Sequence, residues 1–267
     1  MDNHAIPEEV LELILLLVNS LACLVRAAST CKRWRRIVSD AGFRRRFRSI
    51  HGAPIVAGAY YTGKRFQLPH FLPSPSATID GRFFSVDFLP GGPYVWKLKD
   101  SRGSLILLDR RYSNERCNQC SDLIICEPLT RRYETLPTSS SYISFTGAFL
   151  LDGESAEAAG ISMSNFRVLC LLLHEDRTHA AVFTSGSSWQ LKSTDNLWMD
   201  LVGFTTSFIY FYNGGGTVMS VDRHTAEFSS FVLPYIGHWD RRISGRKMSV
   251  SAGSDGEARI VVGEATG

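Results

Sequence analysis

The sequence contains no run of apolar residues long enough to cross a bilayer, which takes about 20 residues. The most apolar stretch near the N-terminus, residues 10–18, is short and is interrupted by Glu12. No Lys or Arg precedes this stretch, whereas a secretory signal peptide begins with positive charge. The sequence therefore predicts neither a membrane span nor secretion.

Cysteine is also scarce, and the six cysteines do not form the dense pattern of a disulfide-bonded secreted domain. Cys117 and Cys120 have the spacing of half a zinc site, but a structural zinc ion takes four ligands and no second close pair is present. A loop between two strands explains this pair as well, so we expect no metal. The composition favours a reduced protein of the cytoplasm, the nucleus or both.

Sequence motifs of common catalytic sites are missing as well. The chain has no Gly-rich phosphate loop, no His-Glu-x-x-His and no Gly-x-Ser-x-Gly. Its seven histidines are scattered, and none lies near an acid and a nucleophile in a recognisable pattern. We therefore expect a protein that is not an enzyme and that uses no cofactor.

Positive charge is concentrated in the N-terminal segment. Residues 1–50 contain nine Lys or Arg and five acids. The remaining 217 residues contain 20 Lys or Arg and 21 acids. This division predicts two parts with different partners. The basic series from Lys32 to Arg48 is typical of solvated helix faces, and neither an aromatic stacking pattern nor a groove-reading motif accompanies it. We therefore expect no nucleic-acid partner.

Residues 5–50 have the pattern of a small helical docking module. Pro7 followed by Glu8 and Glu9 indicates the start of a helix, and the residues from Val10 to Val18 are apolar nearly all round. Further short helices are expected over residues 21–28 and 31–39. A unit of this size has little core of its own, so a helix this apolar should be covered partly by its own domain and partly by a partner.

The order of these residues resembles the F-box family. The run from Ile6 to Leu15 is similar to the opening of an F-box, in which a proline and acidic residues precede a hydrophobic helix. The run from Leu24 to Val38 is similar to the second half, where leucine, arginine, small residues, cysteine, lysine and tryptophan follow in this order. The resemblance is strong over residues 5–48 and weaker beyond, and within the family it is closest to plant, grass-type F-box proteins with a β-rich C-terminal region.

The resemblance implies a substrate-recruiting adaptor subunit of an SCF-type cullin–RING E3 ubiquitin ligase. The N-terminal module would bind a Skp-type adaptor, and through it the cullin–RING ligase, while the β-rich body would bind a protein substrate. The positions that match adaptor-contacting positions of the family are Ile6, Pro7, Val10, Leu11, Ile14, Leu24, Cys31 and Trp34. Two alternatives remain open: a decoy or other protein-binding module outside ubiquitin ligases, and a nucleic-acid-associated β protein with a basic arm.

From residue 52 to residue 267, short apolar runs alternate with Gly, Pro, Asn, Asp and Ser clusters, which predicts an all-β body. The clearest hairpin joins Phe208–Tyr212 to Thr217–Val221 through residues 213–216. A loose repeat relates Leu123–Pro137 to Met219–Pro234, about two propeller blades further along the chain.

The expected architecture is therefore multidomain, α then all-β. A helical F-box bundle at residues 5–50 is followed at residues 52–267 by a β-propeller-like body of about four blade-like units. A pair of β-sandwiches would give similar strings of strands. Because the chain ends at Gly267, directly after an expected strand, we expect the propeller to be incomplete.

Overall fold

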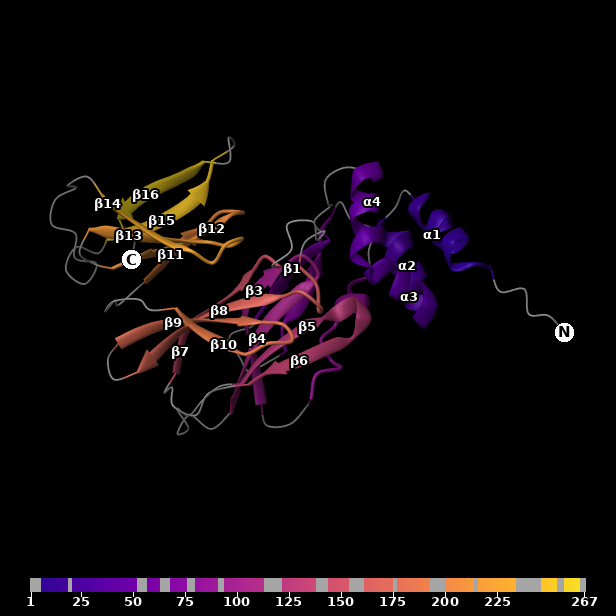
Figure 1. The fold of residues 1–267 in the computed structure, drawn as a ribbon, viewed down its shortest axis with the longest axis horizontal. Helices are drawn as coiled ribbons and strands as arrows, with labels where there is room; N and C mark the ends of the chain where they lie inside the picture. The colour runs from indigo at the N-terminus through magenta and orange to yellow at the C-terminus, as the bar shows by residue number, and fades with distance from the viewer. Residues whose placement is uncertain are drawn as a thin grey trace. The chain divides into compact units, whose positions relative to one another are not determined.

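The computed structural model describes most of the chain in fourteen segments (Figure 1). These are residues 6–18, 21–51, 57–62, 68–75, 80–90, 94–112, 122–137, 144–153, 161–174, 177–192, 200–213, 216–233, 246–253 and 257–264. The chain divides into two compact units, residues 1–140 with 155–166 and residues 141–154 with 167–267. Within the described segments, no helix has the length and apolar character needed to cross a membrane.

The first unit begins with a helical head. It comprises α1 (Glu8–Leu16), α2 (Leu21–Thr30), α3 (Lys32–Ser39) and α4 (Ala41–His51). As predicted, α1 starts directly after Pro7 with two glutamates in its first turn. The side chain of Asp40 caps α4, because its Oδ1 accepts a hydrogen bond of 2.8 Å from the backbone N–H of Phe43.

The head has its own small hydrophobic core. Buried side chains from all four helices form it: Leu11, Leu15, Leu16, Leu24, Ala27, Ile37 and Phe43. At the far end of α4, the ring of His51 lies 4.2 Å from that of Phe47, and its Nε2 is 2.8 Å from the carbonyl oxygen of Leu16. These contacts hold the end of α1 against α4.

A β-rich part completes the first unit. An antiparallel pair, β1 (Gly58–Tyr61) and β2 (His70–Pro73), and the 3₁₀ helix η1 (Gly81–Phe84) precede a four-stranded sheet. This sheet runs in the order β3 (Tyr94–Arg102), β4 (Leu105–Tyr112), β5 (Asp122–Glu127) and β6 (Arg132–Leu136), and η2 (Pro128–Thr130) connects its last two strands. Every neighbouring pair is antiparallel, as in a propeller blade.

Polar contacts of two kinds are buried in this sheet. The pairing of β3 with β4 shifts at Lys99, and the Nζ of this residue lies 3.2 Å from Oδ2 of the fully buried Asp109. Glu127 accepts hydrogen bonds from Ser104 at 2.6 Å and from Thr130 at 2.7 Å. The Nη1 of Arg44 in α4 lies 3.8 Å from Oε1 of Glu127, so an ion pair joins the head to this sheet.

The second unit contains two sheets. The first consists of β7 (Ser144–Leu151), β8 (Arg167–His174), β9 (Arg177–Thr184) and β10 (Trp189–Lys192) in chain order, again antiparallel throughout. The second contains β11 (Asp200–Phe204), β12 (Phe208–Tyr212), β13 (Thr217–Asp222), β14 (Phe228–Val232), β15 (Arg246–Ala252) and β16 (Ala258–Glu264). Its spatial order is β14-β13-β12-β11-β15-β16.

The parallel contact between β11 and β15 depends on a glycine. Gly203 pairs with Val250 and has a φ of +153°, a backbone conformation that other residues rarely adopt. A Cβ atom at this position would lie 2.1 Å from the carbonyl oxygen of Val250. Only glycine therefore allows the two strands to approach this closely.

A common hydrophobic core unites the two sheets of the second unit. It is formed by buried residues of both, including Leu169 and Val182 from one sheet and Ile209 and Phe211 from the other. Buried arginines add hydrogen bonds across the same boundary: Arg223 donates to the carbonyl oxygen of Leu150 at 2.7 Å, and Arg167 donates to that of His224.

The structure confirms the predicted fold class, a helical head followed by a propeller-like, β-rich body. It also confirms the hairpin of β12 and β13, in which Asn213 Oδ1 accepts a hydrogen bond from the N–H of Thr217. The sequence repeat corresponds to two hairpins, β5 with β6 and β13 with β14. In each hairpin the residue after the repeated threonine has a positive φ, 54° at Arg131 and 61° at Ala226.

Cys117 and Cys120 lie outside the described residues. Among the residues that are described, no group of three or more His, Cys, Asp or Glu is placed so that it could hold a metal ion.

Candidate docking surface

Helix α1 has two apolar sides with different environments. Leu11, Leu15 and Leu16 point into the core of the head. On the other side, five large apolar side chains are between 44% and 82% exposed: Ile6, Val10, Leu13, Ile14 and Leu17. Because successive helical residues are separated by about 100°, Val10, Leu13, Ile14 and Leu17 occupy a continuous arc of about 100°, and Ile6 lies just before the helix. We call this surface the α1 stripe.

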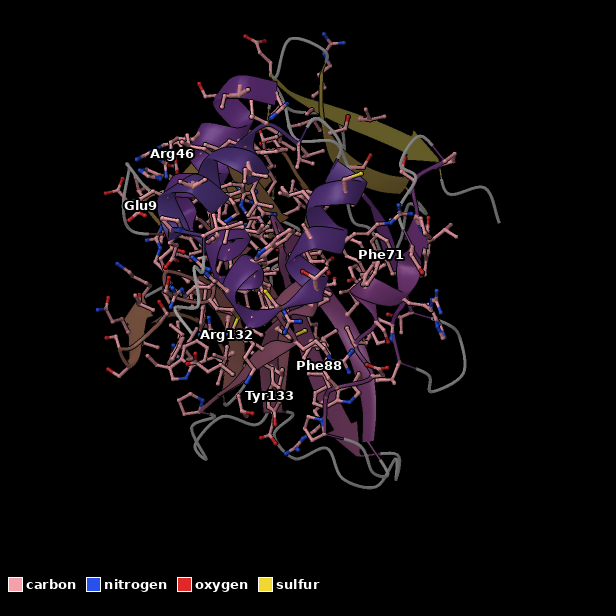
Figure 2. All side chains as sticks on the ribbon, turned by 90° about the vertical axis from the view of Figure 1, so that its right-hand side faces the viewer. Glu9, Arg46, Phe71, Phe88, Arg132 and Tyr133 are labelled. Atoms are coloured by element: carbon pink, nitrogen blue, oxygen red, sulfur yellow. The ribbon has the colours of Figure 1, made fainter. Side chains whose placement is uncertain are left out.

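Two acidic residues on the side opposite the stripe attach α1 to the rest of the head. Glu8 forms an ion pair with Arg36 of α3 at 2.6 Å, and Glu12 forms one with Arg46 of α4. The hydrogen bond from Arg36 lowers the pKa of the Glu8 carboxyl below its ordinary value. In Figure 2, Arg46 lies among the helices of the head, with Phe88 and Tyr133 on the β-rich part of the same unit. These attachments orient α1 so that the stripe faces outward.

The structure separates the predicted site residues into two groups. Ile6, Pro7, Val10 and Ile14 are exposed on or beside the stripe, and Cys31 is exposed at the start of α3. Leu11 and Leu24 are buried in the core of the head, and Trp34 is partly buried against that core. Contact of any of these residues with an adaptor stays a prediction.

Sequence reasoning did not single out Leu13 and Leu17, although both belong to the stripe. They lie three and seven residues after Val10, which is the spacing that places residues on one helix face. That spacing indicates a shared helix face, but the opposite face of α1, with Leu11, Leu15 and Leu16, is equally apolar. The sequence therefore does not show which face is exposed.

Thiol chemistry differs between the head and the first sheet. Backbone N–H groups at the start of α3, that of Trp34 foremost, lower the pKa of the exposed Cys31 thiol. Burial raises the pKa of the Cys126 thiol in β5 to about 12. Cys31 is therefore the more reactive of these two thiols.

The helical head matches a known family. Residues 4–49 match the family model of F-box-like domains, so the class of this segment is F-box-like. The match covers the four helices of the head to within two residues.

The other comparisons give little. No curated protein matches the chain. Among solved structures, apo prolyl oligopeptidase B from Galerina marginata is similar with a TM-score of 0.39 and 11% sequence identity. The similarity covers 74% of this chain but only 27% of that one. It carries no argument about function.

Proposed function

We propose that this chain is a substrate-recruiting subunit of an SCF-type cullin–RING ubiquitin ligase. In this proposal the α1 stripe binds a Skp-type adaptor, and the β-rich body holds a protein substrate. The F-box-like match supports the proposal, because F-box domains in general serve as adaptors of such ligases. The observation that carries it is the exposed stripe on the first helix of that domain.

The physical argument begins with the size of the uncovered surface. The exposed fractions of the five stripe residues add up to nearly three fully exposed side chains. Burying that much apolar surface is worth about 4–8 kcal/mol before the costs of association. A contiguous apolar surface of this kind marks a site of interaction, and an apolar helix face that enters a groove is a recurring mode of recognition.

The chain itself would supply binding and positioning, while the ubiquitin-conjugating enzyme of the complex would perform the chemistry. For the substrate, the β-rich body offers exposed apolar side chains on its strands, among them Leu191 and Val232. The proposal places the protein in the cytoplasm, the nucleus or both. A plant, grass-type relationship is part of the same proposal and rests on the sequence resemblance alone.

Isothermal titration of the full chain with a purified Skp-type adaptor tests the proposal. We expect a saturable 1:1 complex, to which the stripe contributes about 4–8 kcal/mol before the costs of association, so that contacts outside the stripe must add to the affinity. Absence of binding by a chain that circular dichroism shows to be folded would remove the proposal.

The decoy alternative is tested by asking whether cullin co-purifies with the tagged chain. Adaptor binding without cullin would favour a decoy. The nucleic-acid alternative instead predicts binding to DNA or RNA that weakens steeply as salt is added.

A further inference from the structure

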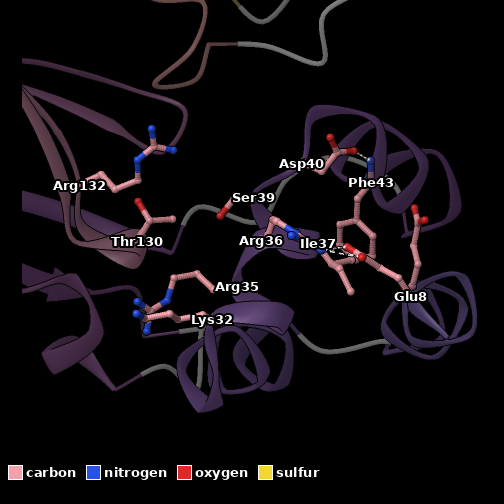
Figure 3. Close-up of a pocket in the computed structure, with 11 residues that line it drawn as sticks. Glu8, Lys32, Arg35, Arg36, Ile37, Ser39, Asp40, Phe43, Thr130 and Arg132 are labelled. Atoms are coloured by element: carbon pink, nitrogen blue, oxygen red, sulfur yellow. Dashed lines mark hydrogen bonds and ion pairs between the residues drawn. The ribbon is translucent and has the colours of Figure 1, made fainter. Parts of the chain in front are cut away.

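A groove of about 570 Å³ lies within the first unit, on a side of the head where α3 and α4 come near the β-rich part. Its wall on the head includes Lys32 and Arg35 of α3, and its wall on the β-rich part consists of Thr130 and Arg132 (Figure 3). The remaining lining residues are Glu8, Glu12, Arg36, Ile37, Ser39, Asp40 and Phe43. Most of this lining is charged.

The acids of the groove already have partners. Glu8 is paired with Arg36, and Glu12 is paired with Arg46. Asp40 accepts a hydrogen bond from the backbone of Phe43 as the cap of α4. The acids are therefore largely satisfied by the head itself and leave the other cations of the groove uncompensated.

Three cations of the groove have no acidic partner within the described part of the chain. Lys32 and Arg132 make neither a hydrogen bond nor an ion pair there. Arg35 donates only its Nε, to the carbonyl oxygen of Ala28 at 3.2 Å, so its terminal nitrogens remain available. Figure 3 shows the charged ends of Lys32 and Arg35 on the same side of α3, with Arg132 on the facing wall.

We propose that this groove binds an anionic peptide segment of a partner protein. An anionic segment in the groove can accept charge-assisted hydrogen bonds from the cations of both walls. Arginine in particular suits carboxylate and phosphate groups, because its planar guanidinium can donate two parallel hydrogen bonds. The ligand is a peptide with clustered negative side chains, either carboxylates or phosphorylated hydroxyls.

The mixed lining favours a peptide over a nucleic acid. Glu8, Glu12 and Asp40 lie among the cations, and a nucleic-acid backbone carries a charge on every phosphate. Such a backbone would bring phosphates close to these carboxylates. A peptide can place neutral or basic residues there and direct its acids to Lys32, Arg35 and Arg132 alone. This inference does not depend on the ligase assignment.

Fluorescence anisotropy with the full chain tests the inference. The probe is a labelled short peptide with clustered glutamates, measured beside its phosphoserine and glutamine counterparts. The groove variant combines Lys32→Gln with Arg132→Gln. The matched control combines Lys97→Gln with Lys192→Gln, which removes two positive charges from exposed strand positions.

The groove variant should raise the Kd for the glutamate or phosphoserine peptide by about tenfold, and the control should change it by less than about twofold. The glutamine peptide should not bind. Of the two anionic probes, prepared with equal total charge, the one that binds more tightly shows whether the groove prefers carboxylate or phosphate. Lys32 and Arg132 are both exposed, so the groove variant should keep the wild-type melting temperature. The single variants Lys32→Gln and Arg132→Gln measure the contribution of each residue to peptide binding.

Three results would overturn the inference. The first is the failure of both anionic peptides to bind at physiological salt. The second is an equal loss of binding in the groove and control variants, which would mean that only net charge matters. The third is groove-dependent binding of a single-stranded oligonucleotide of equal charge that is tighter than that of either peptide.

Discussion

Ile14→Asp should abolish adaptor binding while leaving the fold intact. Ile14 lies on the α1 stripe, is 45% exposed and is not part of the buried core of the head. In the free protein, a carboxylate at this position would face water. The part of Ile14 that is already buried is lost in the variant, so the free energy of unfolding should fall by about 1 kcal/mol. The variant should therefore stay folded and melt about 2–4 °C below the wild-type protein.

The complex should respond very differently to the same change. Loss of the apolar burial of Ile14 costs about 1 kcal/mol, because only half of the side chain is available for burial. An unpaired carboxylate brought into an apolar interface adds at least about 2 kcal/mol. Together these costs raise the Kd by at least about 100-fold.

Isothermal titration of wild type, Ile14→Asp and a matched control measures the effect. The control is Leu191→Asp, which places the same charge at an exposed leucine on β10 in the second unit. Its Kd for the adaptor should equal that of wild type. If Ile14→Asp binds within about threefold of wild type while folded, the stripe is not the docking surface.

Leu11→Asp provides a useful contrast. Leu11 is buried in the core of the head, so a carboxylate there lacks both water and a partner. Adaptor binding should be lost because the head unfolds, and the helical circular dichroism signal should fall. A folded Leu11→Asp chain would contradict the packing described above.

Three further predictions concern the body and the cysteines. Gly203→Ala should lower the free energy of unfolding, measured in urea, by about 2 kcal/mol or more, because the added Cβ would clash with β15. An unchanged midpoint of urea unfolding would argue against the contact of β11 with β15. Lys99→Met should cost about 1.5–3 kcal/mol by removing the ion pair from the buried Asp109 carboxylate, and adding Asp109→Asn should recover part of that loss. At neutral to mildly alkaline pH, iodoacetamide should modify Cys31 and leave the buried Cys126 unlabelled in the folded chain, as peptide mass spectrometry would show. Labelling of Cys31 should slow as the pH is lowered.

Local patterns in the sequence were enough to predict the elements of the fold. Pro7 with two glutamates marks the start of α1, and the turn after Tyr212 marks the reversal between β12 and β13. The repeated threonine likewise marks two hairpins. In each case the signal lies within a few residues, where backbone preferences act directly.

Which face of α1 points inward could not be predicted in this way. The helix is apolar nearly all round, so its periodicity does not distinguish Leu11, which is buried, from Ile14, which is exposed. The distinction depends on the partners of Glu8 and Glu12, which lie 28 and 34 residues away on α3 and α4. Such long-range pairing leaves no local pattern.

The groove was missed for the same reason. Sequence reasoning took the basic series from Lys32 onward to be a solvated helix face. The structure brings Arg132, 100 residues later, to the same groove as Lys32. A cluster that two distant segments create becomes visible only when the sheet and the head are both in place.

Photo-crosslinking from the stripe tests the central claim most directly. Leu17, the most exposed residue of the stripe, would be replaced by benzoylphenylalanine and the chain irradiated with a purified Skp-type adaptor; the same replacement at Leu191 serves as the control. We predict a covalent product with the adaptor from position 17 and none from position 191. Equal products from both positions, or none from position 17, would contradict the proposal that α1 is the docking surface.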